Sequence, residues 1–294
     1  MFRLGHLSDP HFQNFRIDGI RELFGKRALG GLNLLLSRRR KHRMGLLAAM
    51  QGDLQRRALD HLAITGDFCN IALTSEWEAA LRWIAACGLG PESVTVIPGN
   101  HDAYVPEVVK AGTFDRLFAP YMTAQARIGD APYPFARVRG EVAFVCLSTA
   151  VPTGDLGAWG EIGAAQMDRL RAMLLLPELR DRFRVVLIHH PPLVHRPGDD
   201  RNLRDMAALQ ALFQETGADL VLHGHDHRDY FAELPGPGGK AIPVIGVGSA
   251  SYNGSPGKRS RYHVFEIEGR AISVVTYAHV AATNDFQEAY RRTL

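Results

Sequence analysis

Metal-binding side chains follow several short apolar segments of this sequence. Each segment is typical of a β-strand, and each is followed within a few positions by Asp, Asn or His, whose oxygen and nitrogen atoms bind metal ions. These residues are Asp9, His11, Asp67, Asn100, His101, His189, His225 and His227. Carboxylate, amide and imidazole donors suit Mn²⁺, Fe or Zn²⁺. The absence of thiolate donors argues against a structural zinc site.

The expected strands alternate with helices, which predicts an α/β fold. Short β-rich runs predict strands at 2–8, 61–65, 94–97, 142–148, 184–188, 220–222 and 242–247. Apolar periodicity predicts helices at 46–59, 75–87, 163–176 and 203–217. Because loops converge at the carboxyl ends of strands in α/β sheets, ligands spread from Asp9 to His227 can meet in one site. We expect Gly66, Gly99 and Gly224 to allow sharp backbone turns there.

The C-terminal part of the chain changes character. Two apolar segments at about 260–278 indicate an antiparallel β-hairpin that turns at Glu268-Gly269-Arg270. This hairpin predicts mixed β-sheets. No internal repeat, low-complexity tract or linker rich in Ser or Pro interrupts the chain, so we expect a single domain over residues 1–294.

Composition excludes several classes of protein. With 46% hydrophobic and 22% charged residues, the chain is neither disordered nor fibrous. Its three cysteines form no CxxC pair, which argues against a disulfide scaffold and favours a reducing compartment. The sequence has neither a signal-like start nor an apolar run of about 18 residues. We therefore expect a cytoplasmic protein that is soluble or peripheral to the inner face of the membrane.

A basic insertion at about 16–45 carries the positive charge of the chain. Residues 16–43 contain nine Lys or Arg and two acidic residues, a net charge of +7, whereas the whole chain carries +3 and the remainder therefore −4. Apolar residues lie between the basic ones, some at helical spacing, so we expect a short helical hairpin. Either its arginines face water, or the segment binds anionic lipid or nucleic acid.

Five short motifs occur in order over about three quarters of the chain: SDPH, TGDF, PGNHDAY, IHHPPL and HGHDH. Together they resemble the calcineurin-like metallophosphoesterase superfamily, and most of all its bacterial class III cyclic-nucleotide phosphodiesterases and glycerophosphodiesterases. The resemblance implies a four-layer αββα sandwich of two mixed β-sheets flanked by helices. It also implies two metal ions between the sheets and hydrolysis of phosphoesters.

The same resemblance assigns a role to each ligand. It implies one ion on Asp9, His11, Asp67 and His227, and a second ion on Asp67, Asn100, His189 and His225. A hydroxide that bridges the two ions would attack phosphorus in line. His101, which we expect Asp102 to hold in place, would stabilise the transition state or protonate the leaving oxygen.

Other polar residues have weaker signals. Candidate substrate contacts are Asn70, His190, Arg38 and Arg39. Two further histidines adjoin ligands, and we regard both His190 and His223 as groups that could support them. The remaining histidines match no ligand position and are expected to be ordinary core or surface residues: His6, His42, His61, His195, His263 and His279.

Three functional hypotheses follow. The first is a phosphodiesterase that acts on a small organic phosphate. The second keeps this chemistry but places a lipid phosphoester or nucleotide-linked lipid at an anionic membrane, bound through residues 16–43. The third is a nuclease or nucleic-acid-binding protein, which the charge of −4 on the rest of the chain disfavours. Homo-oligomers occur among the relatives, and the sequence leaves open whether this chain forms one. The sequence contains neither a phosphate-binding P-loop nor a GxSxG motif.

Overall fold

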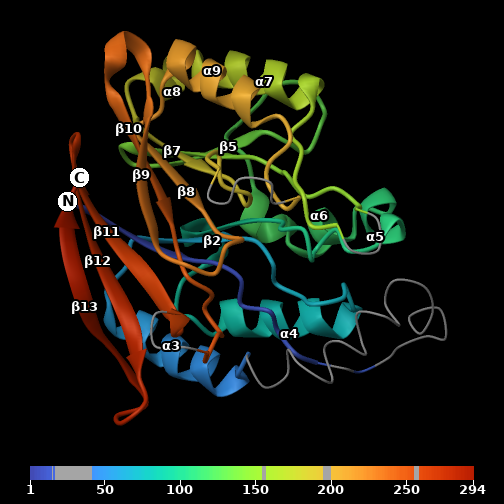
Figure 1. The fold of residues 1–294 in the computed structure, drawn as a ribbon, viewed down its shortest axis with the longest axis vertical. Helices are drawn as coiled ribbons and strands as arrows, with labels where there is room; N and C mark the ends of the chain where they lie inside the picture. Colours follow the sequence, from blue (N-terminus) through green and yellow to red (C-terminus); the bar gives the residue numbers. More distant parts are fainter. Residues whose placement is uncertain (15, 17–41, 154–156, 195–199, 255–257) are drawn as a thin grey trace.

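Two mixed β-sheets pack face to face and are flanked by helices, which gives four layers in the order helices, sheet, sheet, helices (Figure 1). This architecture is the one that the sequence motifs imply. The structure is a computed structural model that describes residues 1–14, 16, 42–153, 157–194, 200–254 and 258–294.

The first sheet has six strands in the order β13-β12-β11-β1-β2-β3. Its parallel half consists of β1 (Phe2–Leu7), β2 (His61–Thr65) and β3 (Val94–Ile97). Its antiparallel half consists of β11 (Arg261–Glu268), β12 (Ala271–Val280) and β13 (Asp285–Thr293). Helices α3 (Met44–Arg56) and α4 (Thr74–Ala85) cover its outer face (Figure 1).

The second sheet has seven strands in the order β4-β5-β6-β7-β8-β10-β9. Their bounds are β4 (Ala126–Arg127), β5 (Phe135–Arg139), β6 (Val142–Cys146), β7 (Phe183–Leu187), β8 (Leu220–His223), β9 (Tyr230–Pro235) and β10 (Ala241–Gly246). Its outer face is covered by α7 (Ala164–Leu174), α8 (Pro177–Arg180) and α9 (Met206–Thr216). Between β3 and β4 the chain forms α5 (Pro106–Lys110) and α6 (Thr113–Leu117).

Alternation along the strands divides the apolar side chains between two cores. In β6, Phe144 and Cys146 point into the core between the sheets, whereas Ala143 and Val145 pack under the helices of the second sheet. Such strands are buried on both faces and therefore appear in sequence as short continuous apolar runs.

The predicted elements lie close to the observed ones, and the main differences are at the sheet edges. The expected pair at 260–278 is present as β11 and β12, but β13 extends it to three antiparallel strands. Strands β4, β5, β9 and β13 were not among the predicted strands. Among the helices of the described residues, none combines the length and the apolar character needed to cross a membrane.

Candidate metal centre

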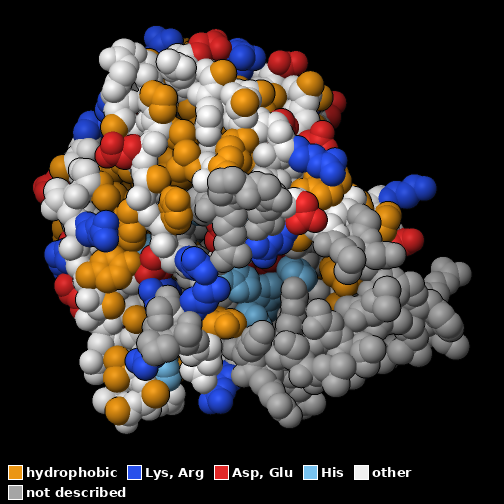
Figure 2. All heavy atoms as spheres, viewed as in Figure 1, with side chains coloured by type: hydrophobic (Ala, Val, Ile, Leu, Met, Phe, Trp, Pro, Cys, Tyr) orange, Lys and Arg blue, Asp and Glu red, His pale blue; other side chains and the backbone are white. Residues whose placement is uncertain are grey.

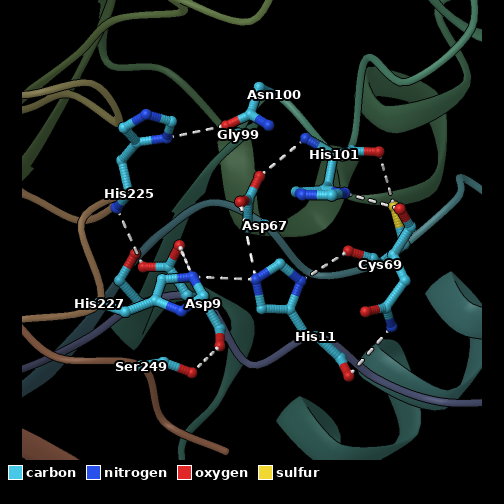
Figure 3. A network of polar contacts seen from close by, with 12 residues as sticks. Asp9, His11, Asp67, Cys69, Gly99, Asn100, His101, His225, His227 and Ser249 are labelled. Atoms are coloured by element: carbon cyan, nitrogen blue, oxygen red, sulfur yellow. Dashed lines mark hydrogen bonds and ion pairs between the residues drawn. The ribbon is translucent and has the colours of Figure 1, made fainter. Parts of the chain in front are cut away.

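All seven predicted ligands lie together at one end of the two sheets. Figure 3 shows the arrangement of these residues other than His189. Each of the seven follows the carboxyl end of a strand: β1, β2 and β3 of the first sheet, and β7 and β8 of the second. The site is therefore built by loops from both sheets, as the positions of the ligands along the sequence predict.

Two overlapping groups of donor atoms form the site. In the first group, the donor atoms of Asp9, His11, Asp67 and His227 lie within 4.8 Å of one another. The second group brings Asp67, His189 and His225 within the same distance. Asn100 joins it, because its Oδ1 lies 2.9 Å from His225 Nδ1 and 3.2 Å from His189 Nε2.

Asp67 belongs to both groups and directs one oxygen toward each. Its Oδ2 lies 3.8 Å from His11 Nε2, and its Oδ1 lies 3.4 Å from His189 Nε2. Burial by itself would raise the pKa of Asp67, but neighbouring histidines, His189 above all, hold that pKa well below its usual range. Asp67 is therefore a carboxylate, the form that can bridge two cations.

Most of the ligands have an unusual backbone conformation. Eight non-glycine residues of the described chain have a positive φ angle, and five of these are predicted ligands. They are Asp9 (53°), His11 (44°), Asp67 (57°), His225 (73°) and His227 (52°). The left-handed region costs a non-glycine residue on the order of 1 kcal/mol or more, and such strain is typical of functional sites.

Hydrogen bonds between the loops hold this conformation. The backbone N–H of Asp9 donates to Gly66 O, and that of His11 donates to Asp67 O, both at 3.0 Å. His225 N–H donates to Asp9 Oδ2 at 3.1 Å and so links the two sheets. The ligand loops thus support one another and fix the spacing of the donors.

Two glycines are required for this close packing. Gly66 has a φ of +92°, which favours glycine. A Cβ atom on Gly224 would lie 1.9 Å from Ser8 Oγ and 2.6 Å from Asp9 Oδ2. The expected role of these glycines is therefore explained by a left-handed turn at Gly66 and by close approach at Gly224.

Three of the predicted histidine ligands are oriented by backbone carbonyl groups. In each of them, a carbonyl oxygen contacts the ring nitrogen that does not face the other donor atoms. His11 Nδ1 lies 3.1 Å from Cys69 O, and His189 Nδ1 lies 2.6 Å from Thr65 O. In His225 the two ring nitrogens exchange these positions: Nε2 lies 3.1 Å from Arg201 O, and Nδ1 faces Asn100. Each carbonyl favours a hydrogen on the nitrogen that it contacts and leaves the other nitrogen as a donor to a metal.

The chemistry of these atoms fits cations. Asp9 Oδ1 is buried and accepts no hydrogen bond within the described part of the chain. The Nε2 atoms of His11 and His227 face each other at 3.2 Å, and His227 Nε2 lies 3.2 Å from Asp9 Oδ1. Burial lowers the pKa of His11 well below its usual value and favours the neutral, ligating form. A metal ion would satisfy all three of these atoms.

His101 lies at the edge of this centre. Its backbone N–H donates to Asp67 Oδ1 at 2.8 Å, and its ring Nδ1 lies 2.6 Å from Asn70 O. The ring stacks on Tyr104 at 5.8 Å between centroids, with an interplanar angle of 7°. It is partly exposed and lines the pocket over the metal ligands.

The expectation that Asp102 holds the His101 ring is corrected by the structure. The Asp102 carboxylate is buried and accepts hydrogen bonds from Gly99 N, Phe68 N, Cys69 N and the indole of Trp77. It therefore ties the loop after β2 to the loop after β3. The carbonyl oxygen of Asn70, and not Asp102, lies on the His101 ring nitrogen.

The candidate substrate contacts occupy different positions. The Asn70 side chain is 1% exposed and donates to the carbonyl oxygens of His11 and Phe12, so it supports a ligand loop. His190 is buried, with its ring nitrogens 2.7 Å from Thr149 Oγ1 and 3.1 Å from Ala158 O. Neither lines the pocket. Arg38 and Arg39 lie outside the described residues.

Sequence reasoning missed three residues near the centre. Arg201 and Lys258 line a pocket of about 180 Å³ above the ligands. Figure 2 shows histidine side chains at the bottom of a hollow with Lys or Arg side chains beside them. His42, which was expected to be an ordinary core or surface histidine, lies beside His11. No short motif marks these positions, because their loops meet only in the folded chain.

Residues 2–229, which make up more than half of the chain, match the family profile of calcineurin-like phosphoesterases. The chain belongs to this family. Membership implies a dimetal centre, and the two donor groups that share Asp67 fit one. The protein is thus a metal-dependent phosphoesterase of the calcineurin-like family.

Solved structures with the same fold include two phosphatases. A purple acid phosphatase from yellow lupin (Lupinus luteus) seeds has a TM-score of 0.61 and 13% identity over 99% of this chain and 53% of its own. A dimetal phosphatase from Danio rerio has a TM-score of 0.60 and 14% identity over 99% of this chain and 98% of its own. This calcineurin-like chain spans about half of the lupin enzyme. No curated protein matches it.

Proposed function

We propose that the protein is a binuclear phosphodiesterase that hydrolyses a small organic phosphate with two ions of Mn, Fe or Zn. The observation that carries the proposal is the pair of donor groups that share Asp67 beneath a small pocket. When bound, two such ions activate a water molecule for in-line attack and offset negative charge on the phosphoryl oxygens.

The side chains of the pocket suit an anionic substrate. Arg201 and Lys258 line the pocket together with the acidic Asp67 and Asp226, and such basic residues attract and orient phosphate. His101 reaches the same pocket with its ring oriented by Asn70 O, so it can give a proton to the leaving oxygen. The volume of about 180 Å³ favours a small substrate group.

The preference for a diester rests on the motifs. GNHD at 99–102 and HHPP at 189–192 resemble those of phosphodiesterases in the family. A metal-dependent monoesterase would use the same ligands, so the two activities must be compared directly.

The test uses bis(p-nitrophenyl) phosphate and p-nitrophenyl phosphate as substrates for metal-stripped protein that is reloaded with Mn²⁺. We expect Mn²⁺-dependent cleavage of the diester to exceed that of the monoester. Asp67→Asn should reduce this cleavage at least about 100-fold, because both ions lose a shared charged ligand. Faster cleavage of the monoester would contradict the diesterase assignment, and equal activity without metal would contradict the whole proposal.

A lipid phosphoester at the inner face of an anionic membrane is the second candidate. The described residues on either side of the basic insertion favour this candidate. On one side, Ser75 Oγ at the start of α4 donates to the carbonyl oxygens of Asn14 and Arg16. On the other side, His42 lies beside His11 in the candidate metal centre. The insertion thus leaves and rejoins the fold beside the ligands.

Replacing Arg38, Arg39 and Arg40 with Ser tests this candidate by co-sedimentation with phosphatidylserine vesicles. Loss of binding in the triple variant would support it, whereas unchanged sedimentation would exclude it. Salt-sensitive retention of DNA or RNA by the wild type would instead favour a nuclease.

A further inference from the structure

His42 lies in a segment that joins the basic insertion to helix α3. This segment pairs with the loop after β10, because Arg43 N–H donates to Ser251 O at 2.9 Å and His42 forms an antiparallel bridge with Tyr252. The His42 side chain is only 5% exposed. It is therefore a fixed part of the folded chain.

The ring of His42 is held on one side and packs against metal ligands on the other. Its Nδ1 lies 2.7 Å from Ser251 Oγ. Its ring centroid lies 4.7 Å from that of His11 and 5.6 Å from that of His227, in edge-to-face arrangements. The same loop also contacts a ligand, since Ser249 Oγ donates to Asp9 O at 2.7 Å.

The donor atoms of His11, His42 and His227 lie within 4.8 Å of one another. This group contains neither carboxylate of the first site, although it shares two of that site's histidines. The His42 donor atom lies outside the group of Asp9, His11, Asp67 and His227. His11 and His227 can therefore hold an ion either with the two carboxylates or with His42.

We propose that His42 completes an alternative position for the first ion, formed by His11, His42 and His227, and so raises the preference of the first site for imidazole-binding ions. This inference rests on the proposed dimetal centre. Imidazole suits Zn²⁺, whereas Mn²⁺ is better served by carboxylates and water. A site with Asp9, Asp67, His11 and His227 can serve either ion. A third imidazole favours Zn²⁺ and Co²⁺ over Mn²⁺.

The test measures metal affinity in His42→Gln without substrate, by competition with a chromophoric chelator. We expect the affinity of one of two sites for Zn²⁺ and for Co²⁺ to fall at least about 10-fold, with a smaller loss for Mn²⁺. X-ray absorption of the Zn²⁺-loaded variant should show fewer imidazole ligands than the wild type. Equal Zn²⁺ affinity and equal imidazole count would overturn the inference.

Two further variants guard against a general loss of structure. His279→Gln replaces another buried histidine, which belongs to neither donor group and whose Nε2 contacts Asn284 at the C-terminal end of β12, and should leave both metal affinities unchanged. Ser251→Ala removes the hydrogen bond on His42 Nδ1 and should weaken Zn²⁺ binding in the same direction but less. A wild type that binds two ions but cleaves no phosphoester would contradict only the proposed function.

Discussion

At the scale of single residues, the candidate site combines predicted metal ligands with a histidine that we propose acts on the substrate. The ligand histidines His11 and His189 are buried, and a carbonyl orients each ring. His101 is oriented in the same way by Asn70 O but is partly exposed and lines the pocket. Its ring is therefore placed for proton transfer, with no ligand role among the described donor groups.

Replacing His101 with Ala should reduce kcat by about 10²- to 10⁴-fold, the usual contribution of a general acid. Metal content should stay at the wild-type level, because the backbone N–H of residue 101 that contacts Asp67 is retained. Elemental analysis and diester hydrolysis on the same sample check both points. A loss of metal in proportion to the loss of rate would show that His101 is instead a structural support.

A second prediction concerns Glu76, a buried carboxyl beneath the ligand loops. Its oxygens accept hydrogen bonds from the backbone N–H groups of Asn70, Ile71 and Leu73. Burial raises the pKa of Glu76 from 4.5 to about 7, although these donors oppose the shift. The folded state therefore retains a proton between pH 4.5 and 7 that the unfolded state has lost.

The stability contributed by this proton is present below pH 4.5 and is lost as the pH rises to about 7. Relative to Glu76→Gln, the free energy of unfolding of the wild type should fall by about 3 kcal/mol over this range. Urea denaturation of both proteins at several pH values measures the difference. A difference that does not vary with pH would show that Glu76 ionises normally.

At the scale of elements, the strands deliver the ligands but the loops set the geometry. The turn at Gly224 follows β8 and packs on the turn after β1, where Ser8 and Asp9 lie. His225 N–H crosses from one turn to the other to reach Asp9 Oδ2. Any widening of this contact moves ligands of both sheets apart.

Gly224→Ala should therefore lower both stability and metal affinity. The added Cβ would lie 1.9 Å from Ser8 Oγ, and overpacking of this kind costs about 1 to 3 kcal/mol. Gly45→Ala in α3 is a matched control, since the added Cβ would meet nothing within 4 Å among the described residues beyond its chain neighbours and its own helix backbone. Thermal unfolding with and without Mn²⁺ compares them. Equal stability of the two variants would refute the argument from close packing.

The elements also show what a sequence can and cannot predict. Strands β2 and β3 have the predicted bounds because they are buried on both faces and are continuous apolar runs. Strand β13 escaped prediction because it is a largely exposed edge strand with polar residues at most positions. In β5, the buried Arg137 interrupts the apolar pattern, and its Nη2 atom donates to the backbone carbonyl oxygens of Pro91 and Glu92.

The residues of the candidate site also fall into those that the sequence predicts and those that it does not. Asp9, Asp67 and His225 belong to motifs in which ligand spacing is local and can be recognised. His42 and Arg201 come to the centre through pairing of distant loops, which no local pattern encodes. Asp102 was misjudged for a similar reason, because its carboxylate is directed at backbone N–H groups of the β2 loop.

At the scale of the whole molecule, the metal centre joins the two sheets. Predicted ligands that follow β1, β2 and β3 meet predicted ligands that follow β7 and β8 at one end of the sandwich. Ions bound there cross-link the two sheets of the folded state. Metal ions at 100 times their dissociation constant stabilise a single-site fold by about 2.7 kcal/mol.

Removal of metal with a chelator should therefore lower the Tm by roughly 5 to 10 °C, and Mn²⁺ should restore it. Asp67→Asn should show little response to either treatment, since both donor groups lose the same carboxylate. Differential scanning calorimetry at matched ionic strength gives the comparison. An identical Tm for stripped and reloaded wild type would contradict a metal-linked fold.

The carboxylate shared by the two donor groups also makes their occupancies interdependent. Because one charge at Asp67 serves both positions, filling one position changes the free energy of filling the other. Thermodynamic linkage requires this coupling to be reciprocal, whichever position fills first. Two independent association constants therefore cannot describe metal uptake. When the metal concentration is limiting, the fraction of protein that holds one ion depends on the coupling free energy between the two positions as well as on the affinity of each position.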